Sequence, residues 1–160
     1  AASDVYKRQT LLIACGLILM FKAILLARAR RHGSPKTRVA AGWNAIRMLA
    51  EQSGITAKGT RRDQAGAIAR QLGTDDQALI QLGREADYAT FSGQDIESGQ
   101  ATTYWTGVDQ LRKAMLASLP RFRRIRTRLS LKSVAILSNG HAAKPHTTHV
   151  KRTRKKGKAS

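Results

Sequence analysis

The chain has a single cysteine, Cys15, and this scarcity removes two classes of site at once. One cysteine cannot form an intrachain disulfide, and it cannot supply a cysteine-based metal site. Cys15 also lies inside a long apolar run, where a thiol packs as a small hydrophobic group. We therefore expect no role for it as a catalytic nucleophile.

Acidic residues are scarce and unevenly placed. Ten Asp and Glu residues stand against 29 Lys and Arg residues, which gives a formal net charge of +19 and a pI near 11.4. Asp4 apart, every acid lies between Glu51 and Asp109, and no acid follows Asp109. A basic excess of this size predicts an anionic partner, either nucleic acid or phospholipid head groups.

The sequence also lacks a recognisable catalytic or metal-binding set. His32 follows the apolar run, and the other three histidines lie in a Lys- and Thr-rich end segment: His141, His146 and His149. No acid stands at a useful spacing from any of them, and His146 and His149 have no third metal ligand nearby. We expect a chain without catalytic activity, cofactor or metal.

The longest apolar run predicts a membrane-spanning helix over residues 10–27. As a helix this segment rises about 27 Å, against a hydrocarbon core of about 30 Å. Its Leu, Ile and Phe residues contribute on the order of −3 to −6 kcal/mol towards insertion, whereas a lysine at the bilayer centre costs about 3 kcal/mol. Lys22 lies near the end of the run, where its stem can reach the interface, so insertion wins. A signal peptide cleaved near Ala27–Ala29 and a buried core helix are the alternatives.

A basic segment, residues 28–36, follows the run at once and predicts the orientation. The juxtamembrane arginines Arg28, Arg30 and Arg31 have no acid beside them. The positive-inside rule then places the rest of the chain in the cytoplasm, as a single-pass protein of the cell membrane. Residues 1–9 are set apart, because "SDVYKRQ" resembles a translated sequencing-adapter remnant.

Residues 37–119 show helical periodicity and predict a small four-helix domain. Thr60 and Asp63 stand at the spacing of a capping box, and glycines such as Gly73 mark helix ends. Aromatic residues make up only 5% of the chain. Those that fall on the apolar faces, Trp43, Tyr104 and Trp105, are expected to pack in the core.

Residues 120–137 predict a basic amphipathic helix after the break at Pro120. Apolar residues share one face, and the candidate lipid- and anion-binding residues occupy much of the rest: Arg121, Arg123, Arg124, Arg126, Arg128 and Lys132. Such a helix is typical of a membrane-surface element. A helix that packs on the domain with a solvated basic face is the alternative. Residues 138–160 have few apolar residues and are expected to be a disordered polybasic tail.

Several segments in order resemble one bacterial family: "GWNAIRMLAEQSGI", "GTRRDQAGAIA", "ADYATFSG", "YWTGVDQLRKAM" and "LPRFRRIRTRLSLKS". They resemble the last membrane span and the cytoplasmic domain of membrane-anchored transglutaminase-like proteins. The resemblance implies a papain-like catalytic domain upstream of residue 10 and a C-terminal domain of unassigned function. No Cys-His-Asp set is present here, so none of the family's catalytic residues can be placed on this chain.

These observations predict an all-α chain: one transmembrane helix, a four-helix cytoplasmic domain, a basic amphipathic helix and a tail. The expected function is a non-catalytic anchoring or interaction role, with anionic phospholipid head groups as the partner. A basic nucleic-acid-binding protein is the alternative.

Overall fold

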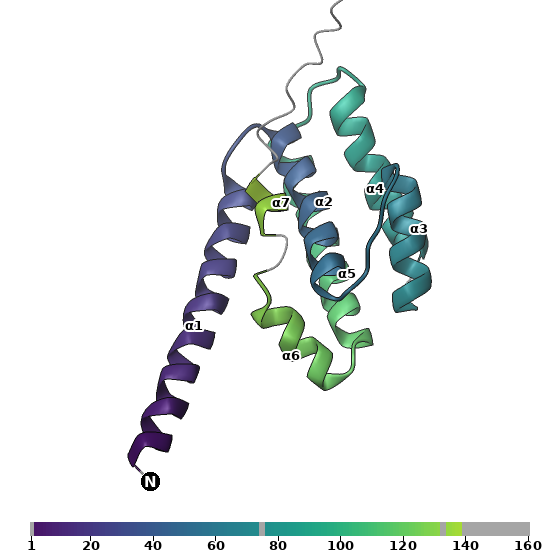
Figure 1. Ribbon diagram of the computed structural model, residues 1–160. Helices are drawn as coiled ribbons and strands as arrows, with labels where there is room; N and C mark the ends of the chain where they lie inside the picture. The colour runs from purple at the N-terminus through teal and green to yellow at the C-terminus, as the bar shows by residue number, and fades with distance from the viewer. Residues whose placement is uncertain (1, 74–75, 132–133, 139–160) are drawn as a thin grey trace, which may run out of the picture.

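Helices account for every regular element in the part of the chain that the structure describes. The structure is a computed structural model, which describes residues 2–73, 76–131 and 134–138. Its helices follow in order (Figure 1): α1 Ala2–Arg31, α2 Pro35–Gln52, α3 Arg61–Leu72, α4 Asp76–Phe91, α5 Ser98–Ser118, α6 Arg121–Leu129 and α7 Ala135–Ser138. The predicted all-α fold, with one long apolar helix at the N-terminal end, is confirmed.

Local sequence signals set the helix ends. Thr60 and Asp63 form the predicted capping box of α3, and Gly73 ends this helix in the left-handed conformation. Ser34 caps α2, and Pro35 occupies the first turn, where its missing N–H costs nothing. Pro120 separates α5 from α6, as predicted.

The four-helix domain is formed by α2 to α5, with α2 at its centre. In Figure 1, α2 lies between α1 on one side and the α3–α4 pair on the other, and α5 packs along it. The fully buried large side chains come almost entirely from α2 to α5: Trp43, Trp105, Ile46, Met48, Ile68, Leu79, Met115 and Val108. Trp43, Tyr104 and Trp105 all lie in this core, as predicted.

The buried aromatic residues keep their polar atoms bonded. The Tyr104 hydroxyl donates to the Leu82 carbonyl at 3.1 Å, and Trp43 Nε1 donates to Gln64 Oε1 at 3.1 Å. Burial raises the pKa of Tyr104 far above its usual value, so this hydroxyl stays protonated. Such bonds hold the helices in one arrangement, because an unpaired buried donor is costly.

Two predicted boundaries differ from the structure. The linker predicted over residues 28–36 is shorter in the structure, because α1 continues through Arg31 and α2 begins at Pro35, which leaves residues 32–34 between them. The helix predicted over 120–137 is two helices, since α6 ends at Leu129 and α7 begins at Ala135. Ser138 ends α7, and the tail prediction for residues 139–160 lies outside the described residues.

Candidate membrane-contacting surface

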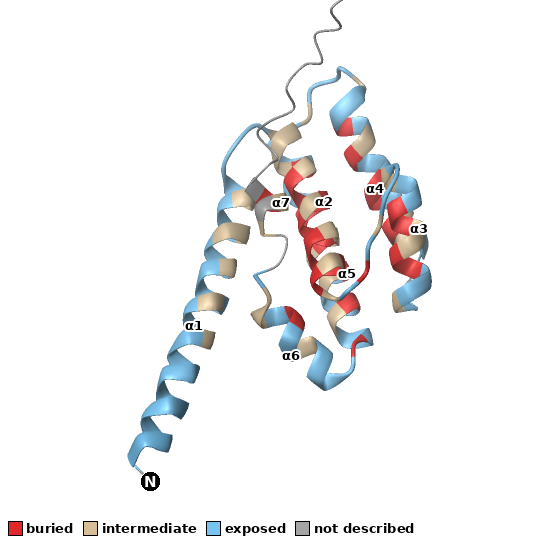
Figure 2. Ribbon diagram, viewed as in Figure 1, coloured by how far each residue is buried: buried red, intermediate tan, exposed pale blue. Residues whose placement is uncertain are grey.

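α1 carries most of the exposed large apolar side chains among the described residues. None of its residues is buried, as Figure 2 shows by the absence of red along this helix. The exposed apolar side chains run along most of its length: Val5, Tyr6, Leu11, Leu12, Ile13, Leu17, Leu19, Met20, Phe21 and Ile24. α1 is therefore one helix that is long and apolar enough to cross a membrane, and no residue of its most apolar window is buried. An exposed apolar surface of this extent marks an interaction site.

One side of the C-terminal third of α1 rests on the domain. Leu26 and Ala29 pack against the core, and Arg30 forms an ion pair with Asp109 of α5. Arg30 also lies over the Trp105 ring, 5.1 Å from its centroid. Arg28 and Arg31, in contrast, are exposed. Of the three predicted juxtamembrane arginines, Arg28 and Arg31 are thus free to meet a membrane surface, whereas Arg30 binds α1 to α5.

Lys22 joins α1 to two other helices. Its Nζ donates to the carbonyl oxygens of Thr127, Arg128 and Ser130 at 2.9 to 3.1 Å, all at the C-terminal end of α6. It also donates to Gln52 Oε1 at 2.7 Å, at the end of α2. The Thr127 and Arg128 carbonyls belong to the last turn of α6, where carbonyls have no N–H partner in the helix, and the C-terminus of a helix favours a cation. The ammonium is therefore bonded to the domain, whereas the sequence predicted that it would reach for the lipid interface.

The side of α6 that faces the domain is polar. Thr127 is buried, and Arg124 caps the end of α5 by donating from Nε to the Leu116 carbonyl at 2.8 Å. The Nη2 atom of Arg124 also donates to the Ala117 and Leu119 carbonyls. Arg124 is thus occupied within the domain and is removed from the predicted lipid-binding set.

The opposite side of α6 is apolar and exposed. The side chains of Phe122 and Ile125 are 78% and 59% exposed, and half-buried Leu129 continues the same face. We call these three residues the α6 stripe. The alternative, a helix that packs on the domain with a solvated basic face, is met in part: α6 packs on the domain through Thr127 and Arg124, but its apolar stripe is exposed as well.

Exposed arginines lie on both sides of the α6 stripe. At 100° per residue, Arg121 and Arg128 fall on one side of it and Arg126 on the other. Arg123 is exposed as well, farther round the helix. Lys132, the last member of the predicted set, lies outside the described residues. The structure therefore brings four of the six predicted arginines and lysines to an exposed surface around an apolar stripe.

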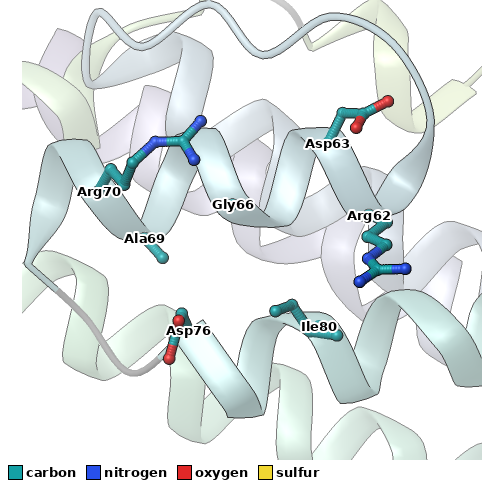
Figure 3. A pocket seen from close by; sticks show the side chains of 7 residues that line it. All are labelled: Arg62, Asp63, Gly66, Ala69, Arg70, Asp76 and Ile80. Atoms are coloured by element: carbon teal, nitrogen blue, oxygen red, sulfur yellow. The ribbon is translucent and has the colours of Figure 1, made fainter.

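A cleft between α3 and α4 carries charged groups but gathers no acid–base pair. Arg62, Asp63, Arg70 and Asp76 contribute to its lining. Figure 3 shows the Asp63 and Arg70 side chains on the side of α3 away from α4. Hydrogen bonds from Thr60 hold the pKa of Asp63 below its usual value, which fits a helix cap. Among the described residues, no group of three His, Cys, Asp or Glu side chains is placed to hold a metal ion.

Arg112, which the sequence pattern did not single out, also has an unusual environment. It lies on α5 beside Asp109, and its Nε atom is buried with no hydrogen-bond partner among the described residues. The buried face of this helix carries Val108, Leu111 and Met115, and Arg112 lies outside it. A second row of residues at helical spacing could have indicated a shared face that includes Arg112: Trp105, Asp109, Arg112 and Leu116.

A search of protein-family models, curated proteins and solved structures finds no match to this chain. No family relationship is therefore shown for it.

Proposed function

We propose that this chain is a single-pass, membrane-anchored, non-catalytic domain that binds anionic phospholipid head groups through α6. The observation that carries the proposal is the exposed α6 stripe with arginines on both sides, tied by Lys22 to the apolar helix α1. An interfacial helix buries such a stripe at the boundary of head groups and acyl chains, while its basic residues meet the head groups.

The bond between Lys22 and α6 sets the level of α6 along α1. Of the residues that precede Lys22, only 10–21 form an uncharged apolar run, and they rise about 18 Å as a helix, against a hydrocarbon core of about 30 Å. From Lys22 onward, one side of α1 is covered by the domain. We therefore keep the predicted span of residues 10–27 and place α6 at the level of its last turns, beside Lys22.

The exposed arginines of α6 supply the electrostatic attraction. Each basic residue near an anionic leaflet contributes on the order of 1 kcal/mol. α1 already holds the domain at the bilayer, so α6 needs no large affinity of its own. The cytoplasmic side follows from the same charges, since exposed Arg28 and Arg31 flank the span and no acid follows Asp109.

Orientation is tested with one introduced cysteine in the full chain. Cys15→Ser removes the native thiol, and Gln94→Cys introduces an exposed one in the loop after α4. We expect a membrane-impermeant maleimide to label Gln94→Cys in inside-out bacterial membrane vesicles and not in intact cells. Labelling in intact cells would refute the cytoplasmic assignment.

Lipid binding is tested with the full chain in nanodiscs by hydrogen exchange of α6. Amide protons of α6 should exchange more slowly in anionic than in neutral discs. The triple change Arg121→Gln, Arg126→Gln and Arg128→Gln should remove this difference. A control with the same loss of charge, Arg62→Gln, Arg70→Gln and Arg84→Gln on α3 and α4, should keep it. Equal exchange of wild-type α6 in both kinds of disc would count against the proposal.

The resemblance to membrane-anchored transglutaminase-like proteins extends the proposal to the parent protein. The chain would then be the cytoplasmic end of such a protein, with catalysis on the other side of the membrane. The nucleic-acid alternative is tested by fractionation. Resistance to carbonate extraction supports the membrane assignment, and nuclease-sensitive sedimentation from the soluble fraction supports nucleic-acid binding.

A further inference from the structure

A pocket between α1 and α5 gathers positive charge at the edge of the proposed membrane anchor. It has a volume of about 370 Å³. Three cationic side chains line it, Arg30, Arg112 and Lys113, together with one acid, Asp109. Its polar lining thus has more positive than negative charge. We call it the α1–α5 pocket.

Arg112 has a hydrogen-bond donor for which the described residues provide no acceptor. Its Nε is buried and has no hydrogen-bond partner in the described part of the chain. Burial, and to a lesser degree the charge of Arg30, lowers the pKa of Arg112, while Asp109 opposes the shift. Asp109 is already ion-paired with Arg30. The Arg112 side chain is only partly buried as a whole, but a donor that is buried without a partner is costly, and an anion in the pocket would compensate the positive charge.

The rest of the lining is apolar and continues towards the membrane. Ala23, Leu26 and Leu116 line the pocket on the side of Lys22. Leu19, Ala23 and Leu26 share one face of α1 at helical spacing, and Leu19 is exposed. An apolar path therefore leads from the cationic side chains into the exposed part of α1.

We propose that the α1–α5 pocket holds the phosphate group of one anionic phospholipid, whose acyl chains lie along α1. Guanidinium groups bind phosphate oxygens in a bidentate manner, and Arg112 and Lys113 of α5 both line the pocket as possible donors. The depth fits as well. Leu26 lies in the last turn of the proposed span of residues 10–27, next to the head-group layer.

This inference rests on the proposed membrane anchoring, but it concerns a separate site from α6. The arginines around the α6 stripe attract the anionic surface as a whole. The α1–α5 pocket would retain a single lipid. A free phosphate ion shares the chemistry of the head group but not the apolar path, so the two sources can be distinguished.

The test uses the full chain in a neutral detergent at constant ionic strength. The probes are dihexanoyl phosphatidylglycerol, dihexanoyl phosphatidylcholine and inorganic phosphate, each titrated while the unfolding temperature Tm is recorded. A ligand that binds the folded state raises Tm in a saturable manner. We expect such a rise with phosphatidylglycerol. An equal rise with inorganic phosphate, or with phosphatidylcholine, would overturn the assignment to an anionic lipid.

Variants locate the binding. Arg112→Gln should weaken the apparent Kd for phosphatidylglycerol at least tenfold, and Arg84→Gln, an exposed arginine of α4, should leave it unchanged. Ala27→Phe keeps every charge and fills the pocket from an exposed position of α1, so it should have the same effect as Arg112→Gln. Ala27→Phe also tests the site if the Arg112→Gln variant fails to fold. Unchanged affinity in Ala27→Phe would overturn the site.

Two readouts distinguish lipid binding in the pocket from a structural role of Arg112 and from lipid binding at α6. If Arg112 were purely structural, Arg112→Gln would lower Tm without lipid, whereas we expect no loss there and only the loss of the lipid-dependent rise. The triple change in α6 described above should leave the Tm rise intact. Loss of that rise in the α6 variant would show that lipid binds at α6 and not in the pocket.

Discussion

Close contact between helices depends on single residues, and Gly42 is the clearest case. A Cβ atom at this position of α2 would lie 2.7 Å from Tyr104 Cε1 and 3.2 Å from Val108 Cγ2. Tyr104 cannot withdraw easily, because its hydroxyl is bonded to the Leu82 carbonyl in the core. The α2–α5 contact therefore requires a residue without a side chain.

Gly42→Ala should lower the free energy of unfolding by about 1 to 3 kcal/mol through overpacking. The control is Gly66→Ala on α3, where the nearest atom to a new Cβ is the flexible end of Arg70 at 3.6 Å. Alanine there should stabilise the helix by roughly 0.5 to 1 kcal/mol. Thermal denaturation in a neutral detergent, followed by circular dichroism, measures both. A stabilising effect of Gly42→Ala would contradict the close packing.

Lys22 is the second residue on which the arrangement depends. Lys22→Met removes a cation that bonds three carbonyl groups of α6 and the amide of Gln52. We expect faster hydrogen exchange in α6 and a loss of about 1.5 to 3 kcal/mol, the usual range for hydrogen bonds to a charged group. Lys36→Met, which removes a surface ion pair with exposed Asp95, should cost less than about 1 kcal/mol. Unchanged exchange in α6 would show that Lys22 does not position this helix.

Among the individual helices, α3 shows how a cap makes stability depend on pH. The Thr60 hydroxyl and backbone N–H both donate to Asp63 Oδ2, at 2.7 and 3.1 Å. These bonds hold the pKa of Asp63 below its unfolded value. A carboxyl group with a lowered pKa stabilises the fold above its unfolded pKa, and this contribution is lost as the pH falls through the folded pKa.

Asp63→Asn tests this cap. The difference in stability between wild type and variant should stay constant above a pH of about 5 and shrink as the pH falls from about 4 to 2. Denaturant unfolding at several pH values measures it. A constant difference down to pH 2 would refute the role of Asp63.

The apolar face of α6 does not pack in the core of the domain, because Phe122 and Ile125 are exposed. The changes Phe122→Ser and Ile125→Ser should alter stability in detergent by less than about 0.5 kcal/mol, because both side chains are exposed. In anionic nanodiscs, the amide protons of α6 should exchange faster in this variant than in wild type. Phe91→Ser changes an equally exposed aromatic residue on α4 and should leave α6 exchange unaltered. A large loss of stability in detergent would mean that the α6 stripe packs on the domain.

For the chain as a whole, the proposed function implies two kinds of force at the membrane. α1 would be held by the hydrophobic effect, which salt does not screen, and α6 largely by charge, which salt does screen. Raising NaCl to about 0.5 M, where the Debye length is only about 4 Å, should leave the chain in the membrane but speed hydrogen exchange in α6. Exchange in α2 to α5, measured in the same samples, is the internal control. Release of the whole chain by salt would contradict a spanning α1.

The all-helical class, the capping box at Thr60, the break at Pro120 and the apolar length of α1 could all be predicted from the sequence. These features depend on periodicity and on contacts within a few residues, which are local in the chain. The burial of Trp43, Tyr104 and Trp105 was also predictable, because each falls on the apolar face of an amphipathic helix.

The roles of the charged residues, in contrast, depend on how distant helices pack. Lys22 bonds residues more than 100 positions away, and Arg124 turns inward to cap α5 while its neighbours stay exposed. Arg30 and Arg112 lie beside one pocket because α1 and α5 lie side by side there. Long, flexible side chains satisfy whichever carbonyl or carboxylate the packing brings within reach. A charge that looks solvated in the sequence can therefore become a contact between distant helices once they have packed.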